Sequence, residues 1–184
     1  MRLAYAVCIG CRLSDYIIDS LVDGPSRLYA YHYRVVNREL DAMALRVANA
    51  IQRMGYEACP IPSSQVIDWD RNVGHASHRW AAYHAGLGWY GRNNLIVSPQ
   101  YGARVRYVTV FTDMPLPTGE SLTQDCGDCR ACIEVCPARA ISERREDFDL
   151  AKCLEQLRFY RNNWNIGHHI CGLCIKACRI RKRL

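Results

Sequence analysis

The sequence has no apolar run that approaches the roughly 20 residues of a membrane-spanning helix. Its first residues form only a short apolar stretch, soon followed by Asp15 and Asp19, and they contain no recognisable signal peptide, cleavage site or transit peptide. Low-complexity segments are also missing. These absences predict a cytoplasmic protein with no membrane partner, in a compartment where thiols stay reduced and clustered cysteines usually bind metal.

The chain has 184 residues, of which 49% are hydrophobic, enough for one core or for a core and a small second module. Its formal net charge is +6, and part of the excess lies at the C-terminal end, in Arg179, Arg181, Lys182 and Arg183. Such an end either contacts nucleic acid or an acidic protein, or is simply a solvated terminus. The sequence leaves both readings open.

The first half of the chain predicts alternating strands and helices. Residues 3–9 suit a buried strand, and Ser14 can cap a short helix that ends before Gly24-Pro25. Ser26 can cap a long helix that ends at Gly55. Its apolar residues recur at steps of three and four and predict one buried face: Val36, Leu40, Met43, Ala44, Val47, Ile51 and Met54.

Further strands are expected at 56–61, at the edge of a sheet because of its prolines, and at 95–98 and 104–111, joined by a turn at 99–102. A second helix is expected at 77–85, and a linker at 115–119. We therefore predict an α+β protein: a mixed α/β domain over 1–118, followed by a cysteine-rich module over 119–184.

The module begins with the spacing C-x2-C-x2-C-x3-C-P, formed by Cys126, Cys129, Cys132, Cys136 and Pro137. This is the bacterial ferredoxin signature, in which three thiolates converge on one [4Fe–4S] cluster and the fourth ligates the other cluster. Structural zinc is the alternative, but zinc sites usually pair two C-x2-C knuckles. The spacing therefore favours iron–sulfur clusters.

A second group of cysteines completes the set of ligands. Cys171, Cys174 and Cys178 repeat the pattern of close ligands followed by one that turns away, and Cys153 supplies the missing member. We predict two [4Fe–4S] clusters in a ferredoxin-like module. One takes Cys126, Cys129, Cys132 and Cys178, and the other takes Cys136, Cys153, Cys171 and Cys174.

Three of the 11 cysteines stay outside this scheme. Cys8 and Cys11 form either a redox pair or half a metal site, or, like Cys59, are small apolar residues near strands. The glycine-rich segment at 85–95 is also ambiguous by itself. Its glycines either let the backbone approach a large ligand or make tight turns.

Taken together, these features resemble epoxyqueuosine reductases. The resemblance depends on the order of Ala-Gly-Leu-Gly-Trp-x-Gly-Arg-Asn at 85–93, Tyr101-Gly102, Thr-Val-Phe-Thr-Asp at 109–113 and the cysteine pattern. It extends from about 66 to 178. That family comprises cobalamin- and iron–sulfur-dependent reductases of tRNA queuosine synthesis and is related to the reductive dehalogenases.

The resemblance implies that the N-terminal domain is cobalamin-reductase-like and that a corrinoid lies beneath the glycine-rich loop. The cofactor-binding residues it implies are Gly86, Gly88, Trp89, Gly91, Arg92 and Asn93. The clusters would pass single electrons to the corrinoid and then to an electrophilic substrate. A ferredoxin or flavodoxin would be the electron donor.

A nearby acid would supply a proton to the substrate. Asp68, after the apolar pair Val66-Ile67, is the residue we expect in this role. Asn72 matches the family position without gaps but cannot donate a proton usefully, and Asp70, His75 and His78 are alternatives. Both histidines could equally cap a helix or lie at the surface.

The sequence departs from the family at both ends. It stops soon after the last cysteine, where the family continues into a helical part that helps to hold tRNA, so we do not expect tRNA as the substrate. Its N-terminal region is short, and a homodimer would be needed if this left the corrinoid site open. A non-catalytic electron-transfer protein that serves a partner oxidoreductase is the alternative function.

Overall fold

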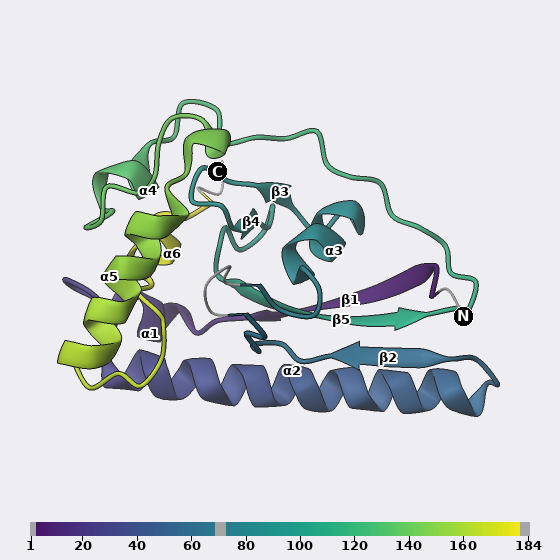
Figure 1. Ribbon diagram of the computed structural model, residues 1–184. Helices are drawn as coiled ribbons and strands as arrows, with labels where there is room; N and C mark the ends of the chain where they lie inside the picture. The colour runs from purple at the N-terminus through teal and green to yellow at the C-terminus, as the bar shows by residue number, and fades with distance from the viewer. Residues whose placement is uncertain (1–2, 69–72, 181–184) are drawn as a thin grey trace.

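The computed structural model describes residues 3–68 and 73–180 and has a mixed α/β fold (Figure 1). Its three-stranded antiparallel sheet has the order β1-β5-β2. The strands are β1 (Tyr5–Arg12), β5 (Val105–Thr112) and β2 (Ala58–Ile61). β2 is an edge strand, as its proline content predicts, because proline has no N–H to donate to a second neighbour. The sheet supports one helix on each face.

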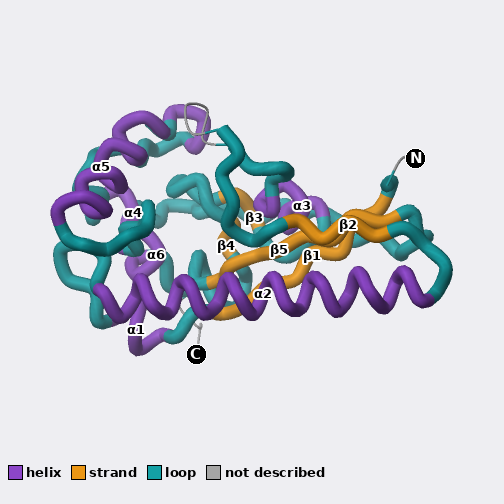
Figure 2. Tube along the Cα trace, turned by 60° about the horizontal axis from the view of Figure 1, so that its bottom comes forward, coloured by secondary structure: helices purple, strands orange, loops and turns teal. Residues whose placement is uncertain are grey.

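One face is covered by α2 (Arg27–Arg53), which runs the length of the sheet (Figure 2). The predicted cap is confirmed, since the Ser26 hydroxyl accepts a hydrogen bond from the N–H of Tyr29 at 3.0 Å. Gly55 has a φ of +88°, the left-handed conformation that ends many helices. Of the predicted apolar face, Val36, Leu40, Ala44 and Ile51 are buried and Met43 and Val47 are partly buried, whereas Met54, at the C-terminal cap, is 62% exposed.

The opposite face is covered by α3 (His78–His84), whose predicted cap Ser77 accepts from the N–H of Trp80. Side chains alternate along β5. Val108 and Val110 pack in the core with α2, whereas Tyr107 packs with Ala82 of α3. The strands predicted at 95–98 and 104–111 are confirmed as β4 (Ile96–Val97) and β5, and the predicted turn between them is closed by an antiparallel bridge between Ser98 and Gly102. β4 pairs with β3 (Trp89–Tyr90).

The rest of the chain gathers at one end of the sheet (Figure 1). It comprises α1 (Asp15–Asp19), α4 (Ala131–Glu134), the 3₁₀ turn η1 (Arg145–Asp147), α5 (Leu150–Asn163) and α6 (Leu173–Ala177). After β5 the chain crosses over α3 in an extended segment without regular elements and reaches α4. The division at 118/119 lies in this segment and stays a prediction.

The two halves of the sequence share one hydrophobic core. Ile166, Ile170 and Leu173, from the cysteine-rich half, pack in the same cluster as residues of α1, α2 and β5. The cysteines are therefore held against the sheet domain by buried apolar contacts.

Some of the residues named in the sequence analysis lie outside the described part of the chain or at its C-terminal end. Asp70, Asn72 and the basic residues 181–183 lie outside the described residues. Arg179 is described, and its guanidinium forms an ion pair with Asp19 of α1. Across the described part of the chain, none of the helices has the length and apolar character needed to span a membrane.

Candidate functional site

The first predicted group of thiols comes together between a loop and the C-terminal end of α6. Burial raises the pKa of Cys178 to about 11, and the nearby thiols of Cys126, Cys132 and Cys129 raise it further. Burial also raises the pKa of Cys132, again with contributions from Cys126 and Cys129. Cys178 is far from the other three in sequence, but it is their electrostatic neighbour in the fold. We call these four residues the first thiol set.

The second predicted group forms around the N-terminal ends of α5 and α6. Burial raises the pKa of Cys153 to about 11, with further contributions from Cys136 and Cys171. Cys174 has a pKa well above the usual thiol value because of burial and then because of Cys171 and Cys153. These four cysteines are the second thiol set. Cys174 also interacts with Cys132, so the two sets adjoin.

All these cysteines are free thiols. In residues 3–68 and 73–180, no group of three or more His, Cys, Asp or Glu side chains is arranged to hold a single metal ion. The two sets are therefore neighbourhoods of four thiols and not formed metal sites. Their chemistry fits the ligand requirement of two [4Fe–4S] clusters, which is four thiolates each. Cluster binding stays a prediction.

The glycine-rich segment packs against the first thiol set. Arg92 donates hydrogen bonds from Nε to the carbonyl oxygen of Glu143 (2.7 Å), from Nη1 to that of Cys129 (3.0 Å) and from Nη2 to that of Gly127 (2.8 Å). A Cβ at Gly91 would lie 3.6 Å from Sγ of Cys126. The loop and the arginine therefore hold the segment that carries Cys126 and Cys129.

The expectation that the three glycines line a cavity is wrong. A Cβ at Gly88 would lie 2.3 Å from the carbonyl oxygen of Val97, and one at Gly86 would lie 2.5 Å from that of Glu120. At Gly91 it would lie 2.7 Å from Cγ2 of Val97. The glycines permit close approach between segments of the chain itself. This is the tight-turn alternative that the sequence left open.

Asn93 and Trp89 behave differently from the glycines. Nδ2 of Asn93 is buried and has no hydrogen-bond partner, and Asn93 lines a pocket of about 340 Å³ that all four cysteines of the second thiol set also line. Buried polar atoms normally have partners, so this amide is suited to a ligand. Nε1 of Trp89 is also buried and unpaired, but Trp89 lines a separate pocket with Tyr83 and Tyr90. Of the six implied cofactor residues, Asn93 is the one that fits this site.

A second pocket, of about 480 Å³, adjoins the Asn93 pocket. The two share Arg79, Leu95, Arg106 and Ile175, and we call the combined space the Arg106 groove. Its far end is lined by residues that include Val66, His75 and His78. Pockets of this size hold small molecules and cofactors. The groove therefore connects the second thiol set with the predicted acid–base region.

His78 is fixed inside this groove. Its Nε2 donates to the carbonyl oxygen of Pro62 and its Nδ1 accepts from the hydroxyl of buried Thr109, both at 2.9 Å. Burial lowers the pKa of the imidazole, which favours the neutral form. Because both ring nitrogens are used within the chain, His78 orients this wall of the groove. His75 lines the groove and is exposed.

Asp68 lies beside the groove, not at the end of a buried strand. It forms an isolated antiparallel bridge with Val73, and Ile67, which precedes it, is 53% exposed. Val66 and Val73, the partner of Asp68 in this bridge, both line the groove. The role of Asp68 as a proton donor stays a prediction.

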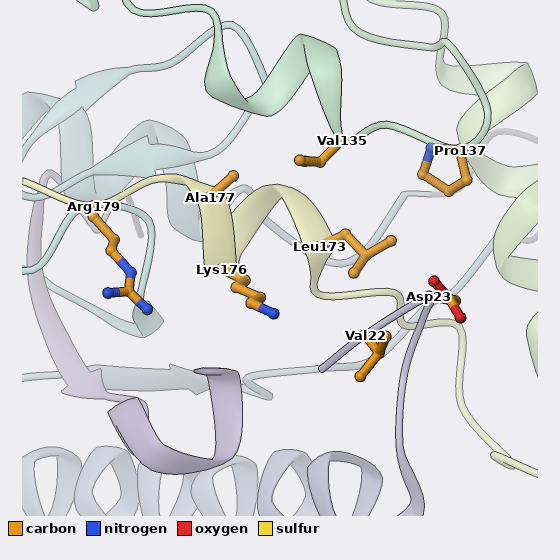
Figure 3. Close-up of a pocket in the computed structure, with 8 residues that line it drawn as sticks. All are labelled: Val22, Asp23, Val135, Pro137, Leu173, Lys176, Ala177 and Arg179. Carbon is orange, nitrogen blue, oxygen red and sulfur yellow. The ribbon is translucent and has the colours of Figure 1, made fainter. Parts of the chain in front are cut away.

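Another pocket, of about 630 Å³, lies on the outer side of the cysteines (Figure 3). Val135 and Pro137, beside Cys136, face Leu173 and Lys176 of α6 across it, and Val22 and Asp23 form another side. Nζ of Lys176 donates to the carbonyl oxygen of Leu21, which ties α6 to the segment after α1. The cysteine segments are therefore accessible from outside as well as from the groove.

The remaining cysteines do not form a pair. Cys11 packs with the core on the α2 side of the sheet, whereas Cys8 packs with the cluster on the α3 side. Burial raises the pKa of Cys8 to about 12. The structure thus supports the reading of small apolar residues, and Cys59 lies exposed on the edge strand.

Two features of the site were missed in the sequence. Arg104 is buried and donates hydrogen bonds to Asp15, Asp19 and the carbonyl oxygen of Lys176, so it joins α1 and α6. Gly102 has a φ of +61°, and a Cβ there would lie 2.1 Å from the carbonyl oxygen of Cys178. The Tyr101-Gly102 pair was noted only as a turn, although its glycine is where Cys178 docks.

The chain is similar in sequence to known reductases, although no family model matches it. An epoxyqueuosine reductase of Bacillus anthracis is 31% identical over 117 residues, covering 58% of this chain and 30% of that protein. A tetrachloroethene reductive dehalogenase of Desulfitobacterium hafniense is 29% identical over 136 residues, covering 71% and 23%. The matched region is thus less than a third of the length of these relatives.

The fold is similar to solved structures of both kinds of enzyme. A catabolic reductive dehalogenase in complex with 3-bromo-4-hydroxybenzoic acid aligns with a TM-score of 0.76 at 23% identity, covering 94% of this chain and 25% of that one. An epoxyqueuosine reductase with a modified tRNA stem loop aligns with a TM-score of 0.60 at 19% identity, covering 95% and 48%. The chain is therefore similar in sequence and in fold to epoxyqueuosine reductases and to reductive dehalogenases.

Proposed function

We propose that the chain is an iron–sulfur reductase unit that binds two [4Fe–4S] clusters and delivers single electrons to an acceptor in the Arg106 groove. The observation that carries this proposal is the grouping of eight thiols, from separate segments, into two adjoining sets of four. The second set lines the groove directly. Two clusters in contact provide a path for electrons from the outer face of the molecule to the groove.

A corrinoid is the acceptor that the relationship favours. It would supply one-electron and two-electron chemistry at its metal. The unpaired Nδ2 of Asn93 and the neighbouring Arg79 would contact its polar groups, and Leu95 and Ile175 would contact its apolar parts. His78 would keep the wall opposite the thiols fixed, and Asp68 or His75 would supply a proton at the open end. The electrophilic substrate would enter from that end.

The test is anaerobic reconstitution followed by titration with cob(II)alamin. We expect about eight irons and eight sulfides per chain, as two [4Fe–4S] clusters require. The matched control is a variant in which serine replaces the three cysteines outside the two thiol sets, Cys8, Cys11 and Cys59. Its iron content should be unchanged. Stoichiometric zinc without brown colour would contradict the clusters.

Corrinoid binding in the Arg106 groove is tested by separate variants. We expect Asn93→Asp and Ile175→Trp to weaken cob(II)alamin binding while the iron content stays at the wild-type value. Gly88→Val is not suitable, because its side chain would meet the carbonyl oxygen of Val97 and disturb the fold. Equal cobalamin affinity in all these proteins would exclude the groove as the binding site.

A non-catalytic electron-transfer protein is the second candidate, and one observation favours it. Cys129, in the first thiol set, is exposed, so a cluster there could exchange electrons directly with a partner protein. On this reading the groove would bind no corrinoid, but the cluster content would be the same. The cobalamin titration therefore distinguishes the two candidates.

A further inference from the structure

The contacts of Arg92 give it a particular relation to the first thiol set. Its guanidinium reaches three carbonyl oxygens, two of which belong to the loop between Cys126 and Cys132. The side chain is only 17% exposed, and its Nε also lies 3.7 Å from the carboxylate of Glu143, which is 54% exposed. An arginine fork held by three acceptors has little freedom to move. Arg92 therefore fixes both a positive charge and a loop conformation beside the first set.

The fixed carbonyls determine where the neighbouring N–H groups point. In a planar trans peptide unit the C=O and the N–H point in opposite directions. Because the carbonyls of Gly127 and Cys129 face Arg92, the N–H groups of Asp128 and Arg130 face away from it. Neither N–H donates a backbone hydrogen bond within the described chain. Both are available to a cluster held by the loop.

The second thiol set has a different environment. Its cysteines lie beside α5 and α6 against the apolar core, with Ile170 and Leu173 as buried neighbours. No arginine side chain of the described residues donates a hydrogen bond to a carbonyl of Cys136, Cys153, Cys171 or Cys174. The second set has polar neighbours of its own, because Arg79 and Arg106 line the same pocket and the N–H of Ala140 donates to Sγ of Cys136 at 3.4 Å, but Arg92 is not among them. A cation held close to a cluster favours the addition of negative charge to that cluster.

We propose that Arg92 is a positioning residue that raises the reduction potential of the first cluster and leaves that of the second unaffected. This inference rests on the proposed function, in which each thiol set holds a [4Fe–4S] cluster. Each reduction adds one electron from an external one-electron donor to a cluster and neither makes nor breaks a bond to the protein. The added negative charge is stabilised at the first set by the guanidinium and by the N–H groups that it orients.

The experiment is a redox titration of the reconstituted full chain, followed by electron paramagnetic resonance. Arg92→Gln should lower the potential of the first cluster and leave that of the second unchanged. Arg130→Gln is the matched control. Arg130 lies in the same loop and pairs with the same carboxylate, Glu143, as Arg92 does, but its side chain is 65% exposed and donates no hydrogen bond to the loop carbonyls. Its removal should give a much smaller shift, because water screens an exposed charge.

The assignment of signals comes from Cys178→Ala, in which only the second cluster should remain. If Arg92→Gln does not retain the first cluster, Arg92→Lys is titrated instead. Lysine keeps the charge but cannot hold three carbonyls, so we expect a lowered potential there too. The inference would be overturned if the potential of the first cluster were unchanged in Arg92→Gln. It would also be overturned if Arg92→Gln and Arg130→Gln shifted that potential equally. Absence of both cluster signals from the wild-type chain would instead contradict the proposed function.

Discussion

The two thiol sets are held in different ways. The first depends on polar and close backbone contacts: the Arg92 hydrogen bonds and the approaches of Gly91 to Cys126 and of Gly102 to Cys178. The second depends on helices packed into the hydrophobic core. The sheet domain is therefore required for both sets, but it holds them through different forces. Changes in one region should therefore affect one set more than the other.

The largest effect is expected from Cys178→Ala, which tests the assignment of the cysteines to two thiol sets. Because Cys178 neighbours Cys126, Cys129 and Cys132, its loss should remove the first cluster and keep the second. Iron content should fall from about eight to about four per chain. Iron analysis and the spectrum of the remaining cluster measure this. Loss of the second cluster with the first intact would mean that the sets are assigned wrongly.

Glycine substitutions test whether close backbone contacts hold the first thiol set. Gly102→Ala combines a φ of +61° with a Cβ that would lie 2.1 Å from a backbone oxygen of Cys178. Strain and overpacking together should cost about 3–4 kcal/mol of unfolding free energy and displace Cys178. The control is Gly127→Ala, which has a φ of +49° but no atom within 4 Å of the added Cβ. It should cost only about 1–2 kcal/mol. Urea unfolding under anaerobic conditions compares them, and equal costs would contradict the close-approach argument.

The second set should respond to changes in the core. Leu173, beside Cys171 and Cys174, is 8% exposed and packs in the shared core. Leu173→Ala should cost about 2–3 kcal/mol and make the second cluster more sensitive to oxygen than the first. Val135→Ala, at a residue that is 40% exposed, is the control and should cost less than about 1 kcal/mol. Thermal unfolding and bleaching by air measure the two effects.

Helix-capping residues predicted the starts of two helices. Ser26 and Ser77 mark the starts of α2 and α3, whereas the division of the eight cysteines into two cluster sites, which comes from their spacing, stays a prediction. These signals are local, because a cap or a ligand spacing is set by residues a few positions apart. They do not depend on which segments meet later.

The contacts between distant segments could not be predicted in this way. The pairing of β3 with β4 and the docking of Cys178 on Gly102 join residues through tertiary packing. The glycines at 86, 88 and 91 form a sequence pattern that is equally compatible with a ligand-binding loop and with a tightly packed loop. Which of the two applies is decided by contacts with Val97 and Glu120, which lie outside the glycine-rich segment. Arg92 was named as a cofactor residue, but its partners lie in the cluster loop.

The smallest expected effect concerns Arg104, which holds α6 from the sheet side. Its side chain is 6% exposed and bonds Asp15 and Asp19, and it also donates to the carbonyl oxygen of Lys176, between two cysteines. Hydrogen bonds from Arg104 lower the pKa of both carboxyl groups below the ordinary value of 3.8. The stabilisation is therefore fully present above about pH 4 and is lost as the pH falls through the lowered values.

Arg104→Gln should cost about 1 kcal/mol at neutral pH, because the carboxylates are 45% and 36% exposed and water screens the pairs. Below about pH 4 the difference between wild type and variant should shrink, since the carboxyl groups are then protonated in both proteins. Acid also attacks iron–sulfur clusters, so the quantity to measure is the difference in unfolding between the two proteins at each pH. Arg144→Gln, which removes an exposed arginine that pairs only with Glu146 and Asp147, is the control. A difference that stays constant as the pH falls would mean that Arg104 acts through the Lys176 carbonyl, which does not titrate, and not through the two carboxylates.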